Sequence, residues 1–262
     1  MLLNKKVFFT LAISLLVLSS FIISHKGEKP VLFIIGDSTV KNGDGTGKNN
    51  QMGWGTMIDM YFDTVKISVS NHAIGGRSSR TFITEGRWDK ILSVLKKGDY
   101  VLMQFGHNDA GPLADTARAR GTIRGVGTDS MEIYNPIRKM QETVYSYGYY
   151  MRKYARDTKA KGAIPVICSP IPRYSIKNGR VDRSDYAEWA RQVAAETGAY
   201  FIPLNDMIAT EYEKMDTAQV RSFFPADHTH TNTAGAVLNA QIVVKGIKGL
   251  DQCQLKKYLI KP

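Results

Sequence analysis

A serine and a histidine far apart in this sequence have the side chains that acyl transfer requires. Ser38 ends a Gly-Asp-Ser triplet that directly follows the apolar run 31–35, and His230 follows Asp227 by three residues. A serine nucleophile needs a base beside its hydroxyl and an anion that holds the base in the correct tautomer. Histidine suits the base role, and a carboxylate three residues earlier can reach its far nitrogen. The alternative is that the triplet only caps a helix.

Two further polar blocks contain candidate donors for the oxyanion of an acyl-transfer intermediate. Gly76 lies in the block Gly-Gly-Arg-Ser at 75–78, and Asn108 lies in Gly-His-Asn-Asp at 106–109. A glycine presents its backbone N–H without steric hindrance, and an asparagine amide is a neutral donor. The backbone N–H of Ser38 would be the third donor. Removing one such donor typically lowers turnover by roughly 10² to 10³.

The elements that must position these residues alternate between strands and helices. Short apolar runs predict strands, and amphipathic segments that end at glycine predict helices. We expect strands at 31–35, 65–70, 99–105, 163–168 and 200–203, and helices at 53–62, 84–97, 137–161, 184–197 and from 233 onward. Alternation of this kind predicts a parallel sheet with helices on both faces.

The candidate residues follow these strands at comparable points. Ser38, Gly76 and Asn108 come after the first, second and third predicted strands, and Asp227 and His230 come after the last strand and an intervening helix. The carboxyl ends of parallel strands lie at one edge of a sheet, where open α/β sheets bind ligands. The four polar blocks are therefore expected to converge.

The length and composition suit one large domain, and the first residues suit an export signal. The chain has 262 residues with 43% apolar residues and a formal charge of +11, but it has no dense basic run with interleaved aromatics, so we expect no nucleic-acid partner. Lys5 and Lys6 precede an apolar segment at 7–23, which predicts a signal peptide over 1–24. An uncleaved membrane anchor is the alternative. We expect a monomeric domain over 30–250 and a tail over 251–262.

Two cysteines could form a disulfide, and one glycine-rich loop partly resembles ion-binding loops. Cys168 lies in an apolar run and is expected in the core, and it could pair with Cys253 or stay free. The loop 41–50 lacks residues that a phosphate-binding or calcium-binding loop requires. It is better interpreted as a mobile rim.

In order and spacing, the four polar blocks resemble those of the SGNH (GDSL-like) hydrolases. Within that superfamily, the segments 71–82, 85–88 and 227–232 look like those of the rhamnogalacturonan acetylesterases. The resemblance implies a three-layer α/β/α, flavodoxin-like fold with a five-stranded parallel sheet. It also implies a serine esterase without a metal or organic cofactor, which removes O-acetyl groups from pectin-type plant cell-wall polysaccharide.

The resemblance also implies residue roles. Ser38 would be the nucleophile, His230 the base and Asp227 its orienting acid, with Ser38, Gly76 and Asn108 forming the oxyanion hole. Further candidates for substrate contact are Asp37, Thr39, Trp54, Arg77 and His107. Arginines that could pair either with galacturonate carboxylates or within the protein are Arg77, Arg80, Arg87 and Arg173. The insertion 110–131 and the loop 171–183 are the segments where substrate preference is expected to vary.

Other interpretations of the same residues stay open. Trp54 and Trp88 could stack on a sugar or lie in the core, and the core is favoured for Trp88. His107 could contact substrate or only shape the turn at Asn108. Asp227, His228 and His230, with His107 or Asp109, could be ligands in a metal-dependent deacetylase. The chain could also be an acetylxylan or other short-chain esterase, or a carbohydrate-binding protein without catalytic activity.

Overall fold

A five-stranded parallel sheet forms the centre of the fold, and the computed structural model describes residues 28–260. The strand order is β2-β1-β3-β6-β9. The strands are β1 (Val31–Gly36), β2 (Ser68–Asn71), β3 (Tyr100–Gln104), β6 (Ile164–Cys168) and β9 (Tyr200–Ile202). The central strands β1 and β3 are almost wholly buried, as expected of a sheet covered on both faces. The predicted sheet is confirmed.

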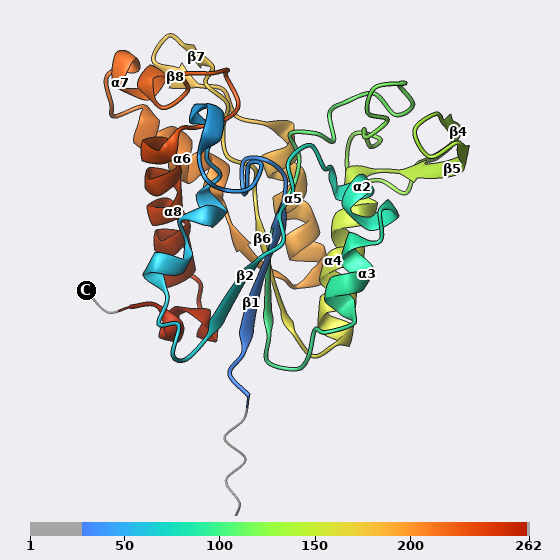
Figure 1. The fold of residues 1–262 in the computed structure, drawn as a ribbon, viewed down its shortest axis with the longest axis horizontal. Coiled ribbons are helices and arrows are strands. Elements are labelled where there is room, and N and C mark those ends of the chain that lie inside the picture. Colours follow the sequence, from blue (N-terminus) through green and yellow to red (C-terminus); the bar gives the residue numbers. More distant parts are fainter. Residues whose placement is uncertain (1–27, 261–262) are drawn as a thin grey trace, which may run out of the picture.

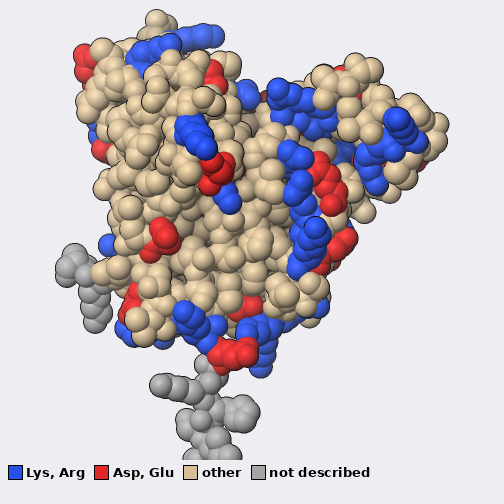
Figure 2. Space-filling view, viewed as in Figure 1, with Lys and Arg blue, Asp and Glu red and all other residues tan. Residues whose placement is uncertain are grey.

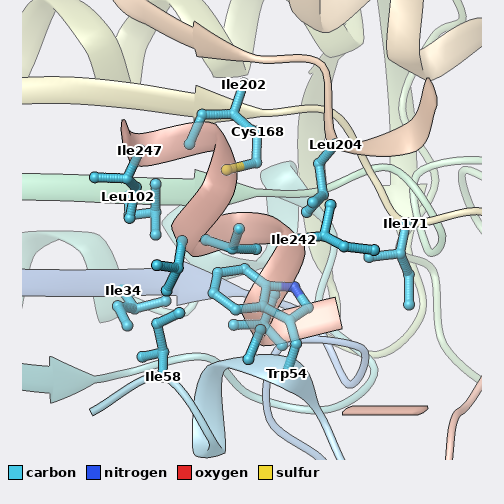
Figure 3. Packing of buried hydrophobic residues seen from close by; sticks show 14 of the residues in the cluster. Ile34, Trp54, Ile58, Leu102, Cys168, Ile171, Ile202, Leu204, Ile242 and Ile247 are labelled. Carbon is cyan, nitrogen blue, oxygen red and sulfur yellow. The ribbon is translucent and has the colours of Figure 1, made fainter. Parts of the chain in front are cut away.

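Helices cover both faces of this sheet and give the three-layer arrangement seen in Figure 1. Along β1, Leu32 and Ile34 pack into one core cluster, whereas Phe33 and Ile35 pack into the other. On the first face lie α6 (Leu204–Tyr212), α7 (Thr217–Ser222) and α8 (Thr233–Lys248), and on the second face lie α2 (Ser79–Thr84), α3 (Arg87–Leu92), α4 (Tyr147–Ala160) and α5 (Asp185–Thr197). Figure 3 shows the interdigitated aliphatic side chains of the first cluster.

Local capping explains where two of the predicted helices begin and end. The Ser184 side chain accepts the N–H of Tyr186 at the start of α5, and Gly198 ends that helix with a left-handed φ of 62°. Asn232 caps α8 by accepting the N–H of Gly235. Both helices match the prediction.

Three predicted helices differ from the structure. The segment 53–62 forms two 3-10 turns, η2 (Trp54–Thr56) and η3 (Asp59–Tyr61), instead of a helix. Gly53, at its start, packs so tightly that an added Cβ would lie 2.3 Å from the Val40 carbonyl oxygen. Of the predicted helix 84–97, only Arg87–Leu92 is helical, as α3, which begins after Gly86 with its φ of 67°. The short helix α2, which ends at Thr84, was not predicted. Residues 137–146 do not belong to a helix, because α4 begins only after its cap at Ser146.

The region that replaces this predicted helix is an antiparallel hairpin that projects from the body (Figure 1). Its strands are β4 (Ser130–Asn135) and β5 (Met140–Tyr145). The carboxylate of Glu142 accepts hydrogen bonds from Arg80 Nε at 2.7 Å and from Asn135 Nδ2 at 2.6 Å. Arg80 is fully buried, so this ion pair fixes the hairpin to the start of α2.

Smaller elements complete the described chain. These are η1 (Lys48–Asn50), the hairpin β7 (Ile176–Lys177) with β8 (Arg180–Val181), and η4 (Gln254–Tyr258). The end of the chain differs from the predicted tail: Leu255 is buried, and Leu259 forms an antiparallel bridge with Phe62. Residues 251–260 therefore pack against the domain.

Both cysteines are buried and free. Cys168 and Cys253 lie in the first core cluster, and burial raises the pKa of each thiol. The predicted core position of Cys168 is confirmed. The signal-peptide or anchor prediction for 1–24 lies outside the described residues. Among residues 28–260, no helix combines the length and the apolar character needed to span a membrane.

Candidate active site

Ser38 emerges at the carboxyl end of β1, as its position after the apolar run predicts. A Cβ added to Gly36 would lie 2.6 Å from the backbone oxygen of Gln104, so only glycine permits the close approach of β1 to β3 at this point. The chain then turns, with the N–H groups of Val40 and Lys41 both bonded to the Asp37 carbonyl. This turn presents the Ser38 hydroxyl at the sheet edge, 2.8 Å from Nε2 of His230.

Asp227 holds the other side of the His230 ring. Its Oδ2 lies 2.7 Å from Nδ1 of His230, and its Oδ1 accepts the backbone N–H groups of Thr229 and His230 at 2.7 and 2.8 Å. Burial opposes the charged form of Asp227, but these hydrogen bonds outweigh burial and lower its pKa. An ionised Asp227 accepts a hydrogen bond from the Nδ1–H of His230, and this tautomer leaves Nε2 free to accept the Ser38 proton.

The candidate oxyanion donors face the same region. Within residues 28–260, the backbone N–H groups of Ser38 and Gly76 donate no hydrogen bond to the protein. Gly76 has a left-handed φ of 80°, and a Cβ on the preceding Gly75 would lie 3.5 Å from Cβ of Ser38. Asn108 donates one amide N–H to the Arg77 carbonyl at 2.9 Å, which orients its amide and leaves the second N–H unused.

These groups line one cavity of about 570 Å³. Its walls come from each of the predicted polar blocks, from the insertion 110–131 and from the loop 171–183. They include Ser38, Gly76, Asn108 and His230 together with Gln51, Arg77, His107, Arg118, Arg120, Ile137 and Arg173. A hydroxyl, an imidazole and neutral N–H donors thus surround a space large enough for a sugar ester, which is an arrangement that could carry out acyl transfer.

Three predicted substrate contacts lie below this cavity rather than in it. Asp37, Thr39 and Trp54 are almost fully buried, at 0%, 2% and 1% exposure. Trp54 Nε1 donates to Gln104 Oε1 at 2.9 Å, and Gln104 Nε2 donates to Thr39 Oγ1 at 2.7 Å. The prediction for these residues was wrong, because they form a buried polar network that supports the site.

The remaining two predicted contacts line the cavity. His107 is engaged at both ring nitrogens, by Asp37 Oδ2 at 3.3 Å and by the Ile171 carbonyl at 3.0 Å. The carboxyl pKa of Asp37 is lowered, because the His107 charge and hydrogen bonds outweigh the opposing effect of burial. Arg77 pairs with Glu85 at 3.0 Å. His107 therefore braces the block that carries Asn108.

Two of the predicted arginine contacts and Trp88 have internal partners. Arg80 is buried against Glu142, and Arg87 pairs with Glu85 at 2.5 Å. The alternative of pairing within the protein therefore holds for both arginines. Trp88 is fully buried and donates to Asp157 at 2.8 Å, so its predicted core position is confirmed.

Gln51 is a site residue that the sequence analysis missed. Its Nε2 donates to Asp227 Oδ2 at 3.0 Å, and its Oε1 accepts from Asn42 Nδ2 at 2.9 Å. The loop 41–50, interpreted above as a rim, thereby helps to hold Asp227 through the residue that follows it. The contact spans 176 positions of sequence and belongs to no motif, so no local signal could have indicated it.

The metal-dependent alternative finds no ligand set in the described part of the chain. Among residues 28–260, no three His, Cys, Asp or Glu side chains are grouped in a way that could hold a metal ion. Both ring nitrogens of His230 are already directed at Ser38 and Asp227. The geometry therefore favours serine chemistry over this alternative.

Comparison with known proteins identifies the family of this chain. The model of the GDSL-like lipase/acylhydrolase family matches residues 34–238. The chain belongs to this family. A rhamnogalacturonan acetylesterase of Emericella nidulans is 34% identical to this GDSL-like hydrolase over 78% of the chain and 82% of the relative. A probable rhamnogalacturonan acetylesterase of Bacillus subtilis is 33% identical over 84% of the chain and 93% of the relative.

Solved structures of other proteins share the fold of this GDSL-like hydrolase. The crystal structure of the protein YxiM from Bacillus subtilis is 26% identical and has a TM-score of 0.67, over 84% of this chain but only 56% of that protein. An acetylxylan esterase of Geobacillus stearothermophilus, 17% identical, has a TM-score of 0.55 over 84% of this chain and 94% of its own, which shows a common fold. Family membership and these relatives make the protein a carboxylic ester hydrolase.

Proposed function

We propose that this hydrolase removes O-acetyl groups from pectin-type polysaccharide by means of a Ser38–His230–Asp227 triad. The observation that carries the proposal is the continuous chain of contacts from Ser38 Oγ to His230 at 2.8 Å and from His230 to Asp227 at 2.7 Å. This chain lies in the wall of a cavity that also contains Gly76 and Asn108.

In the proposed reaction, Ser38 Oγ attacks the acetyl carbonyl carbon while His230 Nε2 takes the hydroxyl proton. The N–H groups of Ser38 and Gly76 and the amide of Asn108 stabilise the resulting oxyanion. Collapse of the intermediate breaks the bond to the sugar oxygen, which receives the proton from His230. Water then attacks the acetyl-enzyme with His230 as base, which releases acetate and restores the Ser38 hydroxyl.

Two observations support an acetylated pectin as the substrate. The two relatives described above, which align with this chain over most of their length, are named rhamnogalacturonan acetylesterases. The cavity contains four arginines, and pectin-type chains carry uronate carboxylates. Acetylxylan is the second candidate, since an acetylxylan esterase has the same fold. We further propose that the apolar segment at 7–23 directs export, which would place the enzyme outside the cytoplasm, where such polymers occur.

Acetate release from a panel of acetylated rhamnogalacturonan, homogalacturonan and xylan, measured under equal acetyl concentrations, tests the proposal. We expect the highest kcat/KM on a pectin-type member, and no release from any member by Ser38→Ala. Preferential release from xylan would replace pectin by the second candidate. Equal release by Ser38→Ala and the unmodified enzyme would contradict the triad.

A further inference from the structure

The cavity beside Ser38 carries an excess of positive charge. Its lining contains one acidic residue, Glu85, and four arginines, Arg77, Arg118, Arg120 and Arg173. Glu85 is already shared by Arg77 and by Arg87 outside the lining. Within residues 28–260, the other three arginines form no ion pair with a carboxylate. None of the three is therefore neutralised by a direct ion pair in this part of the protein, although the carboxylates of Asp37, Asp115 and Asp109 lie close enough to stabilise the charge of Arg120.

Two of these arginines are held in place by the loops that carry the proposed oxyanion donors. Arg120 Nη1 donates to the Gly76 carbonyl at 3.0 Å, and Arg173 Nη2 donates to the His107 carbonyl, next to Asn108, at 3.2 Å. A guanidinium has five N–H donors, so each of these contacts leaves most of its donors available. The arginines are thus oriented at the cavity before any ligand binds, which lowers the entropic cost of binding.

The charge of Arg118 acts on Arg120. Burial, and next the charge of Arg118, lower the pKa of Arg120, and the nearby carboxylates only partly offset them. Two neighbouring cations in a partly buried site repel each other, and a bound anion relieves that repulsion. Figure 2 shows Lys and Arg side chains gathered on the projecting β4–β5 lobe and where the lobe meets the body. An acidic polymer that approaches this face meets a favourable potential.

We propose that Arg118, Arg120 and Arg173 bind uronate carboxylates on either side of the acetylated sugar and make the enzyme selective for acidic over neutral glycans. This inference rests on the function proposed above and adds the residues that set its selectivity. Guanidinium groups suit this role because their planar pairs of N–H donors match a carboxylate. Arg118 and Arg120 come from the insertion 110–131 and Arg173 from the loop after β6, so the three can contact more than one sugar of a chain.

A matched pair of substrates tests this selectivity. One is an acetylated, uronate-bearing pectic oligosaccharide, and the other is the same oligosaccharide with its carboxylates converted to methyl esters. Acetate release gives kcat/KM for each, and their ratio measures the preference for the free acid. Because hydrogen bonds from a guanidinium to a charged carboxylate are stronger than those to a neutral ester, we expect a wild-type ratio of about 10 or more. Added salt should lower this ratio, since it screens the exposed part of the interaction.

Three single variants, Arg118→Gln, Arg120→Gln and Arg173→Gln, should each lower that ratio several-fold, mainly through a higher KM for the free acid. The matched control is Arg156→Gln, which removes an exposed arginine on α4 outside the cavity lining and should retain the wild-type ratio. Equal release from both substrates by the wild-type enzyme, or an unchanged ratio in all three variants, overturns the inference and leaves the proposed function standing. The absence of acetate release from either substrate overturns the proposed function as well.

Discussion

The hydroxyl oxygen of Ser38 lies 2.8 Å from Nε2 of His230, although 192 positions separate the two residues in the sequence. Backbone contacts near both residues maintain this distance. Met52 donates its N–H to the Thr231 carbonyl at 2.7 Å, and Thr231 Oγ1 donates to the Met52 carbonyl at 3.2 Å. The segment that carries His230 is thereby fixed to the segment that follows the Ser38 turn.

Asp227→Asn should lower kcat for acetate release by about 10³ to 10⁴ with a smaller effect on KM. An asparagine amide can donate to Nδ1 of His230, which would favour the tautomer that cannot accept the Ser38 proton. Steady-state kinetics on an acetylated substrate measure the effect, and thermal unfolding of the variant checks that the fold is intact. A folded variant with activity within tenfold of wild type would remove Asp227 from the triad.

Gln51→Glu should move the acid limb of the kcat/KM profile to higher pH by about one unit. The new carboxylate would lie beside Asp227 Oδ2, where Gln51 now donates a hydrogen bond, and the added negative charge would favour the protonated imidazolium of the adjacent His230, which cannot act as base. Gln51→Met, which removes the hydrogen bond without adding charge, is the control and should lower activity with a smaller shift of the limb. If the pH profiles of kcat/KM for Gln51→Glu and wild type are the same, Gln51 has no positioning role.

Asp109 should make the free energy of unfolding depend on pH. Burial raises the pKa of this carboxyl from 3.8 to about 7, although hydrogen bonds from Ser79 act in the opposite direction. The folded state therefore holds the proton more tightly than the unfolded state. The resulting stabilisation is fully present below pH 4 and is lost as pH rises to about 7.

Urea unfolding at several pH values tests this expectation with Asp109→Asn. The variant should lose less stability than wild type between pH 4 and pH 7, because its amide does not titrate. Asp251→Asn, which changes an exposed carboxylate, serves as the control and should follow the wild-type profile. Parallel profiles for Asp109→Asn and wild type would contradict the expectation.

Gly36→Ala should reduce both stability and activity. The added Cβ would lie 2.6 Å from the Gln104 backbone oxygen, so β1 and β3 must separate and the Ser38 turn must shift. Overpacking of this kind costs about 1–3 kcal/mol, and a displacement of about 1 Å at the nucleophile can cost roughly 10² in rate. Gly249→Ala, whose Cβ would meet nothing closer than 3.5 Å, should be nearly neutral. Equal urea midpoints and activities for the two variants would refute this packing argument.

The sequence indicated the sheet and the convergence of Ser38 with His230 because both follow from position at strand ends. The run 31–35 is apolar enough to specify a strand buried on both faces, and parallel topology then determines which edge carries Ser38. The hairpin strand β5 replaces the first part of the predicted helix 137–161, and its Glu142 pairs with Arg80, which is 62 positions away in the sequence, as well as with Asn135 in the neighbouring strand. Local patterns carry no information about such partners.

Trp54 and Gln51 also owe their positions in the site to contacts that the local sequence does not reveal. Trp54 was expected among the possible substrate contacts, but it is buried in the core. The glycines on either side of it, Gly53 and Gly55, pack closely against Val40. Gln51 lies in a polar loop and acquires its role only through Asp227, which tertiary folding brings to it. In contrast, the later start of α3 could have been predicted, since Gly86 lies near the start of the expected helix 84–97 and glycine disfavours a helix interior.

The central claim is that Ser38 forms the covalent intermediate, and mass spectrometry after treatment with a serine-reactive 4-nitrophenyl phosphonate tests it most directly. We expect one adduct per chain, located on the peptide that contains Ser38, with loss of acetate release in proportion to labelling. Ser38→Ala should take up no label and should release acetate at least about 10⁴-fold more slowly than wild type. An adduct on a different residue that abolishes activity, or wild-type turnover by Ser38→Ala, would contradict the account.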